Sequence, residues 1–446
     1  MHPNDDYYWD KVRETRPAEQ RQRVIFERLK AQLEYVYEEI PFYRQLYRAH
    51  GVEPRQIDSL ESFSRRIPVV TKAMLRQSQR DHPPFGNYLG VDFEEVVRIQ
   101  GTSGTTGEPT LFAISAQDWD EISEAQAMQC WAAGLRPDDI VQIVFPLSLY
   151  VGGWGLLGAA ERIGAKVLPM AGGNTERQIM LMQQVGSTVI CGTPSFCLHI
   201  LEKAREMGVD LAAGPLRLGF FGGEPGAGIA GVKQRLESGF GIKAIDFGNV
   251  AELHPCSNME CDQRTGMHVY QDIDYTEVVD PADPNIPLGY NRKGAVVYTH
   301  LWRKSQPMIR YFPGDETIIT DEPCPCGRSY PRMPKGIIGR LDDMLIIRGV
   351  KFYPSDIETI LRSISWLGTE FRIVIEEKGA LQEVTVEVEV DRAVAPANYQ
   401  SIVEQKLEAN LGLRVSVIGK QPGTFPRTAF KARRVIDRTG NHDEQE

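Results

Sequence analysis

Apolar residues near the N-terminus recur every three or four positions, which is the spacing of one face of an amphipathic helix. This pattern predicts a helix over residues 24–40. Pro41 is expected to end it, because proline lacks the backbone N–H that the next helical hydrogen bond needs. The apolar positions of this face are Ile25, Leu29, Leu33, Val36 and Ile40.

Between about residue 140 and residue 250, short apolar runs of strand type alternate with stretches of helical pattern. Such alternation is typical of βα units, in which each helix returns the chain to a neighbouring parallel strand. The sequence therefore predicts an α/β body around a mostly parallel sheet. The predicted strands cover residues 141–145, 166–169, 188–191, 217–221 and 242–247.

The pattern changes after Arg340, where a short helix, two strands, a second helix and a further strand are predicted. Four valines at alternate positions in 384–390 are typical of a half-buried strand. A chain of 446 residues exceeds the size at which one hydrophobic core usually stops growing. We therefore expect a large α/β domain over residues 1–341 and a small α+β domain over residues 342–446, hinged near residues 340–343.

Composition narrows the class of protein. A hydrophobic fraction of 42% can fill such cores, and a net charge of −10 argues against a nucleic-acid or anionic-membrane partner. The N-terminus lacks a basic and apolar leader, and no apolar run approaches the ~20 residues of a membrane span. Seven cysteines in this length do not indicate a secreted disulfide framework. The expectation is a soluble, cytoplasmic enzyme with small anionic substrates.

The segment 101–110, GTSGTTGEPT, combines three glycines with a cluster of hydroxyl side chains. Glycines let backbone N–H groups converge on an anion, and hydroxyls donate to phosphate oxygens, so the segment predicts a polyphosphate-binding loop. The alternative is a Ser/Thr-rich turn. It is not a Walker A motif, because Glu108 stands where a Lys-Ser/Thr pair would follow the last glycine.

A second glycine-rich segment, 153–158, matches the letters G-x-G-x-x-G of dinucleotide-binding loops. No acidic residue ends the strand that follows, where Pro169, Met170 and Ala171 stand, so the ribose contact of such a site is missing. We therefore interpret these glycines as allowing a helix to pack closely on the sheet.

Motifs spread in order along most of the chain resemble the phenylacetate-CoA ligase branch of the adenylate-forming superfamily. The number of ordered matches makes coincidence implausible. The matching segments are IPFYR at 40–44, PVVTK at 68–72, VRI at 97–99 before the loop, GGNTERQ at 172–178, FGGEP at 221–225, RYFPGD at 310–315, GRLDD at 339–343 and PRT at 426–428 with Lys431.

The resemblance implies a large N-terminal domain, a small mobile C-terminal domain and a two-step reaction through an acyl-AMP. ATP and Mg²⁺ would activate a small carboxylic acid, an aryl or arylacetic acid by first choice, for transfer to the thiol of coenzyme A. The alternative is transfer to an amine, or cyclisation, without coenzyme A. A dehydrogenase or a silent ligand sensor would leave the hydroxyl-rich loop, Asp315 and Lys431 without a role. The resemblance also implies a homodimer.

The resemblance further implies how the triphosphate and its charges are held. Glu252 resembles the acidic residue that binds Mg²⁺, although the chain has one extra residue and no hydroxyl before it; a loop cap is the alternative. Lys431 resembles the lysine that bridges the carboxylate and the α-phosphate; a solvated basic face is the alternative. The triphosphate loop would be Thr102, Ser103, Gly104, Thr105, Thr106 and Gly107.

The remaining roles concern the nucleoside, the acid and domain movement. Asp315 resembles the carboxylate that accepts hydrogen bonds from both ribose hydroxyls, with Arg340 on the ribose or phosphate side. Asp342 matches the hinge, and Gly349 would pass the pantetheine arm, where a missing side chain leaves room. The adenine and ribose site would include Gly222, Gly223, Glu224, Pro225, Asp246 and Phe247. The acyl pocket would include Tyr150, Trp154, Gly223 and Phe247, with core packing as the alternative for the first two.

The cysteines fall into two groups. Two close pairs suit a structural, tetrahedral Zn²⁺ site, with His254 as a substitute ligand and free buried thiols as the alternative. These pairs are Cys256 with Cys261 and Cys324 with Cys326. The other three stand in apolar surroundings and are predicted to lie in the core: Cys130, Cys191 and Cys197.

Overall fold

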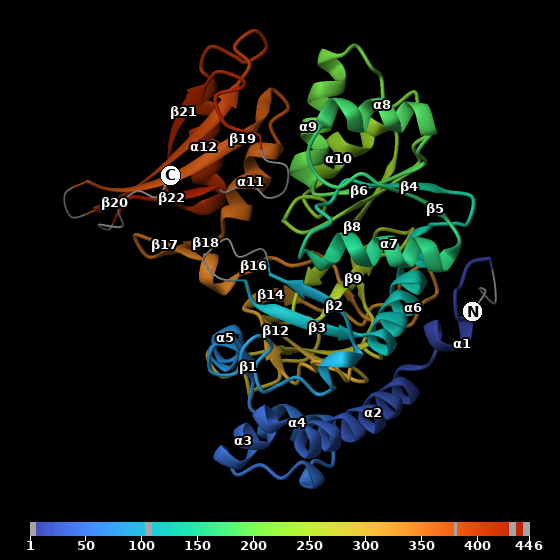
Figure 1. The fold of residues 1–446 in the computed structure, drawn as a ribbon. Helices are drawn as coiled ribbons and strands as arrows, with labels where there is room; N and C mark the ends of the chain where they lie inside the picture. Colours follow the sequence, from blue (N-terminus) through green and yellow to red (C-terminus); the bar gives the residue numbers. More distant parts are fainter. Residues whose placement is uncertain (1–5, 103–108, 379–380, 428–433, 440–446) are drawn as a thin grey trace.

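The computed structural model describes residues 6–102, 109–378, 381–427 and 434–439. Figure 1 shows an upper body built on a parallel sheet, a lower body with a second sheet, and a smaller C-terminal domain beside the upper body. Among the described residues, no helix combines the length and the apolar character that a bilayer span requires.

Helices from the N-terminal part of the chain cover the foot of the lower body (Figure 1). The predicted amphipathic helix is confirmed as α2 (Ala18–Glu39), and its apolar face is buried. Pro41 ends that helix and occupies the first turn of the next one, where the backbone N–H groups have no partner within the helix and proline is therefore tolerated. The other helices of this N-terminal part are α3 (Pro41–Ala49) and α4 (Leu60–Arg66), also at the foot, with α1 (Lys11–Glu14) near α6 (Ala116–Ala133) and α5 (Lys72–Asp81) near β1 (Val70–Thr71; Figure 1).

The lower body contains a six-stranded sheet in the order β1-β13-β12-β14-β16, with β11 paired to β12. Its pairings are antiparallel except that between β1 and β13. A separate hairpin of β2 (Val96–Gly101) and β3 (Leu111–Ser115) flanks the predicted phosphate loop. The sheet strands are β1 (Val70–Thr71), β11 (Asp274–Val279), β12 (Lys293–His300), β13 (Tyr311–Phe312), β14 (Asp315–Ile318) and β16 (Gly339–Arg340).

The upper body is built on an eight-stranded sheet in the order β15-β10-β9-β8-β7-β6-β4-β5. All five predicted strands are present and mutually parallel, which confirms the βα units. From β8 onward the sheet continues antiparallel through β9, β10 and β15. The strands are β4 (Ile140–Ile143), β5 (Lys166–Pro169), β6 (Val189–Gly192), β7 (Leu218–Phe221), β8 (Lys243–Val250), β9 (His254–Glu260), β10 (Met267–Val269) and β15 (Arg332–Met333).

Helices cover both faces of the parallel strands, as buried parallel sheets require. On one side α8 (Thr175–Val185), α9 (Pro194–Glu206) and α10 (Ala230–Phe240) share an apolar core with β6 and β7. On the other side α6 (Ala116–Ala133) and α7 (Val151–Ile163) pack against each other and against β9. Each predicted core cysteine is fully buried in one of these layers.

The glycines of segment 153–158 lie inside α7, so the packing interpretation is confirmed. A Cβ added to Gly155 would lie 2.1 Å from Gln126 Oε1 of α6 and 2.1 Å from Pro255 Cβ of β9. The absence of a side chain at this position therefore lets the two helices and the strand meet.

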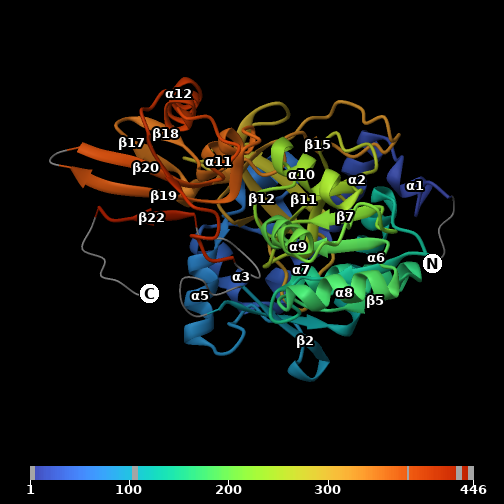
Figure 2. The same cartoon turned by 90° about the horizontal axis from the view of Figure 1, so that it is seen from above.

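The C-terminal domain is a four-stranded sheet in the order β21-β20-β19-β22, with two helices sharing its core. Its predicted helices and strands are confirmed, whereas β22 was not predicted. The domain extends sideways from the body when seen from above (Figure 2). Its elements are the hairpin β17 (Leu345–Ile347) and β18 (Val350–Phe352), α11 (Pro354–Arg362), β19 (Leu367–Lys378), β20 (Leu381–Val390), α12 (Tyr399–Leu411), β21 (Ser416–Lys420) and β22 (Val435–Asp437).

Replacing Gly155 by alanine is expected to destabilise the protein by about 1–3 kcal/mol, because the added methyl group overlaps atoms of α6 and β9. Thermal unfolding followed by circular dichroism measures the change. Gly158→Ala in the same helix is the matched control, since the atoms nearest to its Cβ are the Ser123 Oγ at 3.0 Å and the Trp119 ring at 3.3 Å. Equal melting temperatures for the two variants would contradict the packing argument.

Candidate active site

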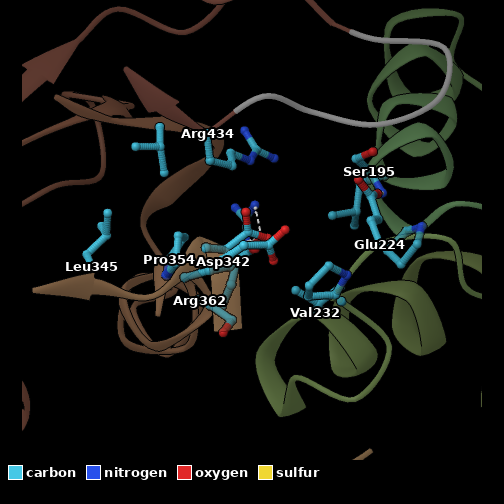
Figure 3. Close-up of a pocket in the computed structure, with 16 residues that line it drawn as sticks. Ser195, Glu224, Val232, Asp342, Leu345, Pro354, Arg362 and Arg434 are labelled. Atoms are coloured by element: carbon cyan, nitrogen blue, oxygen red, sulfur yellow. Dashed lines mark hydrogen bonds and ion pairs between the residues drawn. The ribbon is translucent and has the colours of Figure 1, made fainter. Parts of the chain in front are cut away.

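A cleft of about 440 Å³ separates the large domain from the small one. Ser195, Glu224 and Val232 form one wall, and Leu345 and Arg434 of the small domain face them (Figure 3). The predicted adenine residues Glu224 and Pro225 and the predicted hinge residue Asp342 also line it. A volume of this size is typical of sites for small ligands.

Glu252 lies in the turn between β8 and β9, and its side chain is buried. Lys72 Nζ, at the start of α5, is 3.3 Å from Glu252 Oε1, which accepts no hydrogen bond among the described residues. Tyr311 also faces this carboxylate: burial, and then the proximity of Glu252, raises the pKa of Tyr311 well above its usual value. A buried carboxylate offers the hard oxygen ligands that Mg²⁺ prefers, and Lys72 and Tyr311 border it.

Asp315 begins β14, and the sheet register places it opposite Arg340 of β16. Arg340 Nη1 is 3.7 Å from Asp315 Oδ1. Burial raises the pKa of Asp315 to about 6 against the opposing effect of Arg340, and the charge of Glu252 adds to the rise. The charge of this carboxylate therefore changes close to neutral pH.

Arg340 also holds the predicted hinge residue. Its Nε and Nη2 donate to the two carboxylate oxygens of Asp342 at 2.9 and 2.8 Å, which is a bidentate pair. Burial alone would raise the pKa of Asp342, but these hydrogen bonds and the charge of Arg340 lower it. One guanidinium thus links the predicted ribose carboxylate to the hinge.

Three of the predicted acyl-pocket residues lie together. Tyr150 Oη is 2.9 Å from the position that a Cβ on Gly223 would occupy. Gly222 packs on Phe247, since its Cβ would lie 2.5 Å from the Phe247 carbonyl oxygen. Phe145, which the sequence did not single out, completes an aromatic group, with its ring centre 5.6 Å from Tyr150 and 5.9 Å from Phe247.

Two predicted site residues have other neighbours in the described structure. Trp154 donates its indole N–H to Ser148 O at 2.9 Å, and the Arg98 guanidinium lies 5.3 Å from its ring centre. Asp246 is buried beside Glu260, which accepts a hydrogen bond from the Asp246 backbone N–H at 2.9 Å. Burial, and then the charge of Glu260, raises the pKa of Asp246 to about 7.

Gly349 forms the tip of the β17–β18 hairpin. Arg348 and Gly349 both have positive φ, at 50° and 81°, as the two-residue turns favoured in hairpins require. In the described part of the chain, no atom beyond the adjacent residues lies within 4 Å of the position of a Cβ on Gly349, so the tip is open on that side.

Only part of the predicted phosphate site lies within the described residues. Thr102, which follows β2, is buried, and its Oγ1 accepts a hydrogen bond from the Thr110 N–H at 3.1 Å. The rest of the phosphate loop is not described, namely Ser103, Gly104, Thr105, Thr106 and Gly107. Lys431 likewise lies in the undescribed segment 428–433.

Three of the predicted zinc-site cysteines converge, together with a histidine that was not predicted. Cys261 Sγ is 3.8 Å from Cys324 Sγ, and Cys326 Sγ is 3.4 Å from His268 Nε2. All four ligand atoms lie within 4.8 Å of one another and are buried. The side chain of Cys256, the fourth predicted ligand, is outside the described part of the structure.

The substitute ligand His254 is elsewhere, so that part of the prediction is wrong. His254 Nε2 lies 3.0 Å from Asp274 Oδ1, and its ring packs edge-on against His300 and is stacked on Trp302. His254 starts β9, whereas the thiols gather at the far end of that strand, next to Cys261. The length of β9 separates the two groups.

Sequence patterns gave only weak signals for three residues that the structure places at these sites, namely His268, Lys72 and Tyr311. His268 stands seven residues after Cys261 and is brought back by the antiparallel β9–β10 pairing, which cysteine spacing alone does not reveal. Lys72 and Tyr311 belong to motifs that matched the family, but their contact with Glu252 joins segments far apart in the chain.

Comparisons with known proteins agree with this geometry. Residues 47–248 match the model of the AMP-binding enzyme family, and residues 349–439 match that of the AMP-binding enzyme C-terminal domain. A 2-hydroxyisobutyryl-CoA ligase in the postadenylation state, in complex with 2-HIB-AMP, is 42% identical with a TM-score of 0.94, over 98% of this chain and 94% of that one. The same enzyme in the thioesterification state with 2-HIB-AMP and CoA is 43% identical over the same shares of the two chains, with a TM-score of 0.76.

A curated relative from Thermus thermophilus, a phenylacetate-coenzyme A ligase, is 37% identical over 95% of this chain and 98% of its own length. The similarity extends along nearly the whole of both chains, so it covers both the large and the small domain. The chain therefore belongs to the phenylacetate-coenzyme A ligase family of AMP-binding, adenylate-forming enzymes.

Proposed function

We propose that this enzyme activates a small carboxylic acid with ATP to an acyl-AMP and transfers the acyl group to coenzyme A. The observation that carries the proposal is the meeting of Glu252, Asp315 and Arg340, which come from three separate segments, beside the interdomain cleft. Relatives that are named as ligases of coenzyme A, similar over nearly the whole chain, support thioester formation.

The residues around Glu252 meet the charge requirement of the first step. Attack of a carboxylate on the α-phosphate brings negative charges together, so cationic groups must be fixed in place beforehand. Glu252 would hold Mg²⁺ through its buried oxygen, and Lys72 balances the charge of this carboxylate. When bound, the ion would polarise and neutralise the phosphate oxygens. Lys431 stays the proposed bridge between the carboxylate and the α-phosphate.

Asp315 is proposed to accept hydrogen bonds from the ribose hydroxyls, with Arg340 keeping its carboxylate oriented. Glu224 and Pro225 border the cleft from the large domain and would contact the adenine. Phe145, Tyr150 and Phe247 form an aromatic wall near Gly223 that suits a flat acid, so an aromatic acid is the first candidate.

The domain boundary at residues 341 and 342, the hinge at Asp342 and the passage of the pantetheine arm at Gly349 are parts of the same proposal. The turn that contains Asp342 connects the last strand of the body to the β17–β18 hairpin, which is the position that a hinge requires. We also propose a homodimer in the cytoplasm, where ATP and coenzyme A are both available.

The thiol cluster is proposed to bind a structural Zn²⁺ through Cys261, His268, Cys324 and Cys326. Tetrahedral zinc with Zn–S bonds of 2.3 Å places two sulfurs about 3.8 Å apart, and a sulfur and an imidazole nitrogen about 3.5 Å apart. The observed separations, 3.8 Å between two sulfurs and 3.4 Å between a sulfur and an imidazole nitrogen, agree with these two values. The ion would join the 324–326 loop to β9 and β10.

Pyrophosphate release with ATP and Mg²⁺ should occur with one or more members of a panel of acids, and a thioester should form only when coenzyme A is added. The panel includes phenylacetate, benzoate and 2-hydroxyisobutyrate. The thioester is identified by mass spectrometry. Sustained pyrophosphate release without coenzyme A would point instead to an acceptor such as an amine, and preference for the aliphatic acid would contradict the aromatic assignment.

The KM for ATP is expected to rise as the pH falls below about 6. The pKa of Asp315 is raised to about 6, so its carboxylate is ionised above that pH and protonated below it, where it accepts ribose hydrogen bonds poorly. Asp315→Asn should raise the KM for ATP about tenfold at neutral pH, since a charge-assisted hydrogen bond is replaced by a neutral one. Steady-state kinetics between pH 5 and pH 8 provide the test.

The Asp315→Asn variant also serves as the control, because any protonation of ATP itself changes the KM of both enzymes in the same way. Only the difference between the two pH profiles reports the carboxylate. Parallel profiles for the wild-type enzyme and the variant would rule out the assignment of Asp315.

Protein purified without chelator should contain about one equivalent of zinc by elemental analysis, because four buried ligands complete one tetrahedral site. Cys326→Ser and His268→Gln should each lower the zinc content and the melting temperature. Cys191→Ala is the matched control, since Cys191 is equally buried in another part of the core. Zinc below roughly one tenth of an equivalent in the wild-type protein would refute the site.

A further inference from the structure

Glu202 on α9 of the large domain touches two separate parts of the small domain. Its Oε1 accepts a hydrogen bond from Thr369 Oγ1 of β19, and its Oε2 accepts one from Arg427 Nε at 3.1 Å. His199, one turn earlier on α9, places its Nδ1 3.9 Å from the same carboxylate. Both oxygens of Glu202 are therefore engaged across the domain interface.

Arg427 is held from both sides. Its Nη1 and Nη2 donate to the two carboxylate oxygens of Glu389 on β20, at 2.9 and 2.8 Å, while its Nε donates to Glu202. The pair with Glu389 lies within the small domain and moves with it. The contact with Glu202 joins the two domains and exists only while the small domain keeps this orientation.

The position of Arg427 in the chain gives this contact a functional meaning. Arg427 precedes by four residues the proposed catalytic Lys431. A tether at Arg427 therefore lies close in the chain to the lysine that is proposed to deliver an ammonium group to the α-phosphate.

The contact is stronger than an ordinary surface ion pair. The side chain of Arg427 is 18% exposed and that of Glu202 is 27% exposed. Burial alone would raise the pKa of Glu202, but the nearby His199 imidazole, the hydrogen bond from Thr369 and the charge of Arg427 lower it to about 2. The carboxylate is thus fully ionised at neutral pH, and its hydrogen bonds are charge-assisted.

A second set of contacts supports the same orientation without reaching toward Lys431. Arg235 of α10 donates to the carbonyl oxygens of Ile364 and Leu367, each at 3.2 Å, just beyond α11. These bonds fix where the small domain rests, but they lie on elements that carry no proposed reacting group. Glu202 is distinguished by its contact with Arg427, which lies close to Lys431 in the sequence.

We propose that Glu202, with Thr369 and Arg427, forms a domain latch that positions the small domain for adenylation and opens before thioester formation. Glu202 acts through the position of the small domain and so is a positioning residue. The close match of this domain arrangement to a postadenylation complex agrees with that role. The inference rests on the proposed two-step reaction.

Glu202→Gln should slow adenylation by roughly three- to tenfold, because a partly buried, charge-assisted contact is weakened. Thioester formation from preformed acyl-AMP and coenzyme A should be unchanged or faster, because that step needs the latch open. Acid-dependent exchange of pyrophosphate into ATP measures the first step, and rapid-quench analysis of the thioester measures the second.

Three controls separate a latch from a structural role. Glu206→Gln lies on the same helix, where Glu206 pairs only with Lys203 on the surface, and should change neither step. Thr369→Val removes one latch hydrogen bond and should slow adenylation less than Glu202→Gln, and the two changes together should be less than additive. Glu202→Asp, which restores the charge, should recover part of the adenylation rate. Unchanged melting temperatures show that folding is intact.

The outcomes are distinct. Equal loss in both steps, or no loss of adenylation with Glu202→Gln, overturns the latch. If the wild-type enzyme itself forms an acyl-AMP but no thioester, the proposed function fails at its second step, and loss of pyrophosphate exchange in Glu202→Gln would still support the adenylation half of the inference.

Discussion

The pairing of Asp315 with Arg340 across β14 and β16 is the constraint on which the arrangement of the site depends. The backbone register sets these two residues opposite each other, so an acidic group that would face repulsion from Glu252 gains a cation beside it. Because Arg340 also donates two hydrogen bonds to Asp342, the same side chain holds the start of the connection to the small domain. The proposed ribose site and the proposed hinge therefore share one residue.

Much of the scaffold could be predicted because local patterns determine it. The parallel strands β4 to β8 were each recognisable as short apolar runs between helical stretches, and the alternating valines marked β20. The antiparallel continuation of the upper sheet was not visible in this way. Strands such as β10 and β15 have only two or three residues and take their place from pairing with distant segments, not from periodicity.

The same physical distinction separates the site residues predicted from the sequence from the neighbours that only the structure adds. Asp315, Arg340 and Glu252 stand in contiguous motifs, whereas His268 reaches the thiols only through the turn between β9 and β10. Lys72 meets Glu252 across 180 residues of sequence, and no spacing rule connects them. The cysteine pairs were visible because thiols are scarce in this chain. A single histidine among eight gave no comparable signal.

The double pairing of Arg427 has a consequence for the energy barrier of domain rotation. A guanidinium that lost its single partner inside an interface would be left as an uncompensated charge, and such states are costly enough to slow a movement. If the small domain turns as proposed, Arg427 would keep both hydrogen bonds to Glu389, and water would replace it beside the partly exposed carboxylate of Glu202. The small domain thus contains a counter-ion for Arg427, and the proposed rotation would not leave the guanidinium without an acidic partner.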